Sequence, residues 1–107
     1  MLIWTEGYWP WIMGGDVNAP LGMEVDGGEP ISLGDGIQVH EIKLPDGRTA
    51  IAEASTGAIV GVNLQTVRDD VAKADPAFMR QQISAAKQRA QKVQRLEVAE
   101  FLRIWEA

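Results

Sequence analysis

His40 is the only histidine of the chain, and Glu53 is its closest candidate partner for chemistry. If Asp46-Gly47 forms a two-residue turn, the two side chains face each other across antiparallel strands, where a carboxylate can orient an imidazole. The chain has no cysteine and no suitable serine beside this pair, so we expect an ordinary polar cross-strand contact. The sequence therefore predicts no catalytic residue and no enzyme, and a small enzyme or ligand binder built on this pair is the weakest alternative.

Several carboxylates lie in the glycine-rich part of the chain, where calcium ligands are often found. They are Asp16, Glu24, Asp26, Glu29 and Asp35. Their spacing does not match an EF-hand loop, and Pro20 interrupts the run of possible ligand positions. The stretch GDGIQV is not a dinucleotide fingerprint, and there is no Walker-type lysine. We therefore predict neither a metal ion nor a cofactor.

The stretch WTEGYWPW near the N-terminus contains three of the four tryptophans and the only tyrosine. Large aromatic side chains are usually buried, so core packing is one interpretation. Along a strand, Trp9 and Trp11 would point to one face and Tyr8 to the other, while Pro10 keeps this strand at a sheet edge or outside the sheet. We therefore expect at least one accessible ring, and Tyr8, Trp9 and Trp11 are candidate partner-binding residues.

A second candidate surface is a group of cations that follows Pro76. It consists of Arg80, Lys87, Arg89, Lys92 and Arg95. Such a face could bind a phosphate backbone, so a nucleic-acid-associated regulator acting through helix 80–95 is the alternative function. The cations fan over about half of the helix circumference and no aromatic residue lies among them, which favours a solvated polar face. Nucleic acid is therefore not the expected partner.

The composition indicates a small globular protein. The chain has 107 residues, 46% of them hydrophobic, and we expect a single domain over residues 1–107. Residues 1–75 contain twelve acidic and four basic residues, whereas residues 76–107 contain three acidic and six basic ones. The absence of cysteine, of a basic n-region and of a long apolar run predicts a cytoplasmic protein with no signal peptide and no membrane partner.

Glycine divides the chain into two halves, because all eleven glycines lie at or before Gly61. The clearest element in the first half is an antiparallel meander with strands at 37–44, 48–54 and 58–62, and shorter strands are expected at 1–5, 8–13 and 22–26. A two-residue turn would place His40 and Glu53 on one sheet face. It would place the alanines of the second strand on the other face, where a helix could pack closely. A three-residue loop would exchange the faces.

The second half is predicted to be helical. Asn63 is a plausible N-cap of a short helix over 63–74, and Asp75 and Pro76 end it and begin the next one. Nothing breaks a helix from 76 to 106, where an apolar stripe runs from Met79 to Ile104 and is interrupted by Glu97. Glu97 would either meet solvent or fix the register of a helical interface.

A helix of that length would be about 45 Å long, which exceeds the diameter of about 34 Å expected for a domain of this size. The helix must therefore kink, or its overhanging end must be covered by a partner. Leu102 and Trp105, near that apolar end, are further candidate partner-binding residues, and a homodimer through the C-terminal helix is expected.

The sequence as a whole predicts an α+β fold. A small antiparallel β-sheet in residues 1–62 is followed by a short helix and a long C-terminal helix that packs on the sheet or extends from it. The predicted function is a non-catalytic protein-binding module, such as an adaptor, an assembly factor or an inhibitor of a larger complex. It would use the aromatic N-terminal segment and the apolar end of the C-terminal helix.

Overall fold

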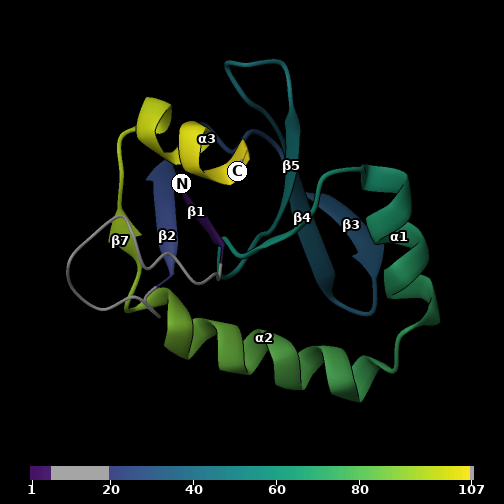
Figure 1. Cartoon of the computed structure of the whole chain (residues 1–107). Coiled ribbons are helices and arrows are strands. Elements are labelled where there is room, and N and C mark those ends of the chain that lie inside the picture. Colours follow the sequence, from purple (N-terminus) through teal and green to yellow (C-terminus); the bar gives the residue numbers. More distant parts are fainter. Residues whose placement is uncertain (6–19, 107) are drawn as a thin grey trace.

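The computed structural model describes residues 1–5 and 20–106, with side chains described as far as Arg103. Strands dominate the first half and helices the second, which confirms the predicted α+β fold (Figure 1). The elements are β1 (Leu2–Thr5), β2 (Leu21–Glu24), β3 (Ile31–Gly34), β4 (Ile37–Lys43), β5 (Thr49–Glu53), β6 (Ile59–Gly61), α1 (Leu64–Lys73), α2 (Pro76–Ala90), β7 (Gln94–Arg95) and α3 (Val98–Glu106). The predicted strand at 8–13 lies outside the described residues.

The strands form two sheets. In one, β2 pairs antiparallel with β1 and parallel with β7; in the other, β3, β4, β5 and β6 form an antiparallel series. The predicted meander corresponds to β4, β5 and β6, and it is confirmed. Trp4 of β1 joins the sheets, because its backbone N–H donates to the Gly57 carbonyl at 3.0 Å and its indole N–H donates to the Thr56 carbonyl at 2.8 Å.

The hairpin between β4 and β5 has a three-residue loop. The Leu44 N–H donates to the Arg48 carbonyl at 2.8 Å, which leaves residues 45–47 as the loop. Gly47 closes it with φ of +90°, a left-handed conformation that glycine adopts without a steric penalty. The Arg48 backbone N–H donates to Asp46 at 3.0 Å, and this bond is the main cause that lowers the pKa of the Asp46 carboxyl.

This loop shifts the strand register by one residue from the two-residue alternative. His40 lies opposite Ala52, and Val39 lies opposite Glu53. The predicted pairing of His40 with Glu53 is therefore wrong, because the extra loop residue sends them to opposite faces. The alanines also change face: Ala50 and Ala52 belong to the cluster that contains Ile42.

Two apolar clusters cover the two faces of the four-stranded sheet. The larger one lies between the two sheets and α3, and its buried members are Ile3, Leu21, Met23, Ile42, Leu44, Ala50, Ala52, Phe101 and Leu102. The smaller one lies between the opposite face and α1, and its members are Val39, Ile51 and Val67, with Ile31, Leu33, Leu64 and Val71 packed against them.

The starts of α1 and α2 are set by the predicted caps. The Asn63 side chain accepts a hydrogen bond from the Thr66 N–H at 3.0 Å, and Asp75 accepts one from the Ala77 N–H at 3.1 Å. Pro76 occupies the first turn of α2, where its missing N–H costs nothing.

The expected long helix over 76–106 is two helices separated by a strand. The backbone N–H of Gln94 donates to the Pro20 carbonyl at 2.9 Å, and the backbone N–H of Leu96 donates to the Gly22 carbonyl at 2.8 Å. The edge of β2 therefore supplies the hydrogen bonds that a continued helix would make. Gly22 permits this approach, since a Cβ there would lie 2.7 Å from Val93 Cγ1. The chain then folds back, and Phe101 enters the core.

Glu97 lies between β7 and α3 and is exposed to solvent. Its backbone carbonyl accepts a hydrogen bond from the Phe101 N–H at 3.0 Å, in the first turn of α3. Glu97 therefore meets solvent in this chain, and the apolar stripe is interrupted because Glu97 precedes the helix. A role of Glu97 in fixing the register of an interface stays a prediction.

Two glycines with similar φ angles should differ sharply in their tolerance of alanine. Gly57 has φ of +79° and its Cβ would lie 2.0 Å from the Leu2 carbonyl oxygen, whereas a Cβ at Gly47 would meet nothing within 4 Å. We expect Gly47→Ala to lower the free energy of unfolding by about 1 kcal/mol through backbone strain alone. Gly57→Ala should lower it by about 3 kcal/mol or more, because β1 must also move. Urea unfolding measures both, and equal losses would contradict the assigned contact.

Candidate functional site

Helix α2 runs along one side of the molecule (Figure 1). None of its 15 residues is buried. Met79, Ile83 and Ala86 recur at helical spacing, and all three are half-buried. Phe78, one position from Met79, has 54% of its surface exposed. An amphipathic helix normally buries such a stripe, so the apolar side of α2 is incompletely covered.

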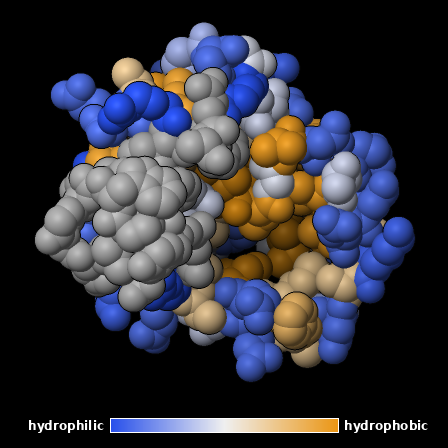
Figure 2. All heavy atoms as spheres, in the orientation of Figure 1, coloured by the Kyte–Doolittle hydropathy of each residue, from blue (hydrophilic) through white to orange (hydrophobic). Residues whose placement is uncertain are grey.

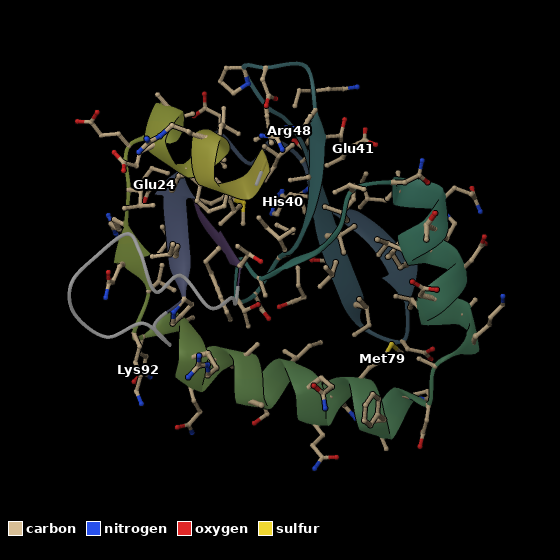
Figure 3. The ribbon with its side chains drawn as sticks, in the orientation of Figure 1. Glu24, His40, Glu41, Arg48, Met79 and Lys92 are labelled. Carbon is tan, nitrogen blue, oxygen red and sulfur yellow. The ribbon has the colours of Figure 1, made fainter. Side chains whose placement is uncertain are left out.

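An apolar cavity of about 220 Å³ lies between α2, α1 and the four-stranded sheet. Figure 2 shows hydrophobic side chains around a hollow in this region, and Figure 3 shows Met79 on the side of α2 that faces the sheet. The aliphatic and thioether side chains that line it from the sheet and the two helices include Ile37, Val39, Val67, Val71, Met79 and Ile83. We call this space the α2 cavity.

Exposed apolar side chains occur close to the α2 cavity. Val60 of β6 lines it and is 50% exposed, and Val62, two positions further along the chain, is 62% exposed. Among the described residues, the large hydrophobic side chains exposed to solvent are Val60, Val62 and Phe78. They place apolar surface on both β6 and α2, the elements that border the cavity.

Two wider depressions adjoin the α2 cavity along the same helix. One, of about 470 Å³, shares Ile37, Glu53 and Ile83 with the cavity and is also lined by Arg80 and Lys87. The other, of about 350 Å³, shares Gln82 with it and lies beside Trp4 and Thr5 of β1. Among the described residues, depressions therefore lie between α2 and the strands along most of the helix.

Glu53 is the one buried charged residue in the described part of the chain, with 7% of its surface exposed. The backbone N–H groups of Ser55 and Thr56 donate to its carboxylate at 3.0 Å each, and their hydroxyls donate at 2.7 and 2.8 Å. These bonds satisfy both carboxylate oxygens and hold the turn after β5. Although Glu53 lines the cavity, its role is therefore structural.

The His40 side chain is also held by the backbone. Its Nδ1 lies 2.9 Å from the Gly27 carbonyl oxygen, and because a carbonyl only accepts, Nδ1 carries the proton of this bond. His40 points to the face of the sheet opposite Glu53 and does not line the α2 cavity. The structure thus offers no geometry for chemistry by this pair.

The structure describes only some of the predicted partner-binding residues. Tyr8, Trp9 and Trp11 lie outside the described residues. Leu102 is 9% exposed and packs in the larger cluster, so the structure places it in the core and not on a partner surface. The reason is the break after α2, which lets α3 return to the sheets. Trp105 belongs to α3, and its side chain is not among those described.

The predicted basic face is divided among three elements. Arg80, Lys87 and Arg89 are on α2, whereas Lys92 lies in the following turn and projects away from the body (Figure 3). Arg95 is in β7 and pairs with Glu24 at 3.3 Å. A single helical face over 80–95 does not exist, because α2 ends at Ala90.

In the described ranges 1–5 and 20–106, no three acidic or histidine side chains lie close enough together to hold a metal ion. Within the same ranges, no helix has the length and apolar character needed to cross a bilayer.

Sequence reasoning missed the α2 cavity and its exposed neighbours. The available signal was Phe78, which stands beside the Met79–Ile83 stripe in an otherwise polar helix. The cavity itself had no sequence signal, because its walls come from strands and helices whose relative placement depends on tertiary packing.

Comparisons of the chain with protein-family models, with curated proteins and with solved structures find no significant match.

The structural role of Glu53 gives a testable difference between two glutamates of the sheet. Glu53→Gln removes the charge and replaces one accepting oxygen by an NH2 group that only donates, so we expect a loss of about 3 kcal/mol in the free energy of unfolding. Glu41→Gln is the control, because Glu41 is exposed on β4 (Figure 3) and should change stability by less than about 0.5 kcal/mol. Similar small losses in the two variants, measured in urea, would contradict the role given to Glu53.

Proposed function

We propose that the chain is a non-catalytic protein-binding module and that its binding surface is formed by α2 and the exposed part of β6. The observation that carries this proposal is that no side chain of α2 is fully buried, although the helix bears an apolar stripe and an exposed phenylalanine. Apolar surface of this kind, next to a cavity, is typical of interaction sites.

Covering this surface is energetically favourable. Removing apolar surface from water contributes about 25 cal/mol per Å². Phe78, Val60 and the half-buried Ile83 have surface left to cover. Aromatic and aliphatic side chains at the centre of an interface supply most of the binding energy in typical complexes.

The attachment of α2 supports the same proposal. Its N-terminal end follows α1 through the Asp75 cap, and its C-terminal end leads into β7, which is paired with β2. The helix is thus fixed at both ends, and among the described residues depressions lie along its inner side. A helix held in this way presents a preorganised surface, which reduces the entropy lost on binding.

The other predicted contact regions have less support. Tyr8, Trp9, Trp11 and the Trp105 side chain remain predictions. Homodimerisation through the C-terminal helix is less favoured, because Phe101 and Leu102 are buried within the same chain. Nucleic-acid binding is also less favoured, since the basic residues are divided among α2, a turn and β7 while the whole chain has a net charge of −5.

The proposal predicts that Phe78→Ser weakens partner recovery without unfolding the protein. Phe78 is exposed, so the thermal melt should change little. The loss of an aromatic interface contact should reduce recovery of a discrete partner from native extract about tenfold or more. Ala77→Ser is the matched control, because Ala77 is the exposed neighbour in the same turn. Equal recovery of the same proteins by both variants would count against α2 as the binding surface.

A further inference from the structure

We propose that the α2 cavity receives one large apolar side chain of a protein partner, and that a cation beside this side chain on the partner faces Asp70. This inference rests on the proposed function and names the chemistry of the partner segment. It uses three observations: the volume of the cavity, its apolar lining and the sign of the charge at its border.

The cavity volume fits a single side chain. Apolar cavities of about 150 Å³ hold a benzene ring, so a cavity of about 220 Å³ accommodates one aromatic or long aliphatic group but not a helix. Its walls come from the sheet, α1 and α2, and Val60 stands half-exposed among them. An anchor placed there would be surrounded by apolar atoms that exclude water, as at an interface hot spot.

The charge at the cavity is negative. Among the described residues, Glu53 and Asp70 line it and no cation does. The Glu53 carboxylate is already satisfied by Ser55 and Thr56, which leaves Asp70 as the group that can respond to a partner. Asp70 is exposed on α1, and none of the described cations forms an ion pair with it.

The charge of the whole chain acts in the same direction. The net charge of −5 attracts a basic segment at long range and repels an acidic one. Arg80 and Lys87 line the adjoining depression and do not line the cavity itself. A phosphate backbone would meet Asp70 as a like charge. The segment that fits is therefore apolar and basic.

The test uses two blocked tripeptides with the same central tryptophan, one with lysine and one with glutamate on both sides. Each is titrated into the full-length isotope-labelled chain and followed by NMR. We expect the basic peptide to shift the signals of Val60, Val67 and Met79 saturably. Its Kd should be about 1 mM, because a tripeptide is a small ligand. The acidic peptide should bind at least about tenfold more weakly.

Matched variants locate the binding site. Val60→Lys places a cation at the cavity and should abolish binding of the basic peptide, whereas Val62→Lys alters an exposed valine that does not line it and should not. Asp70→Asn should reduce the preference for the basic peptide about threefold or more, and Asp69→Asn, one position earlier on α1, should leave it unchanged. The thermal melts of all four variants are compared first, so that a folding defect is recognised.

The inference is overturned if neither peptide binds, if both bind equally, or if Val60→Lys leaves the shifts intact. Its failure is distinguishable from failure of the proposed function. If Phe78→Ser loses partner recovery and neither peptide binds, the proposed binding surface stands. The inference that the α2 cavity receives an apolar side chain is then overturned. If the basic peptide binds but Phe78→Ser recovers the partner as well as the wild type does, α2 is not the partner surface. The cavity then does not receive a side chain of that partner.

Discussion

The hydrogen bonds around the turn from Ser55 to Gly57 hold together the elements on which the rest of the structure depends. The Glu53 carboxylate accepts bonds from the backbone of Ser55 and Thr56, and the Gly57 N–H donates to the Glu53 carbonyl at 2.7 Å. The backbone N–H and the indole N–H of Trp4 donate hydrogen bonds to carbonyl groups of the same turn. One turn therefore fixes the start of β6 and joins the two sheets, and through β6 it positions Val60 at the α2 cavity.

The position of α2 follows from what happens at its two ends. The Asp75 cap starts the helix directly after α1, and the pairing of β7 with β2 ends its path on the other sheet. Fifteen helical residues span about 22 Å, so the helix bridges between distant parts of the body. Because the ends are fixed elsewhere, the middle of α2 packs loosely on the strands, and an apolar cavity is left beneath it.

Local chemistry in the sequence predicted some of these features well. Asn63, Asp75 and Pro76 act through neighbouring backbone atoms, so their caps could be recognised without knowledge of the fold. The register of β4 and β5 could not be fixed in this way, because Pro45-Asp46-Gly47 is compatible with two loop lengths that exchange the faces of His40 and Glu53. The break after Ala90 had no local signal either, since the hydrogen bonds that replace the helix come from β2, some seventy residues earlier in the chain. The α2 cavity could not be predicted because it depends on this same break.

The central claim is that a protein partner contacts α2 on its apolar side. Photo-crosslinking in cells tests it most directly, with a benzophenone amino acid placed at Phe78 in one variant and at Gln88 in the other. Gln88 is exposed on the same helix but lies between Lys87 and Arg89, away from the exposed hydrophobic side chains. The account predicts a discrete crosslinked product from position 78 that is absent or much weaker from position 88. Indistinguishable products from the two positions, or no product from position 78, would contradict it.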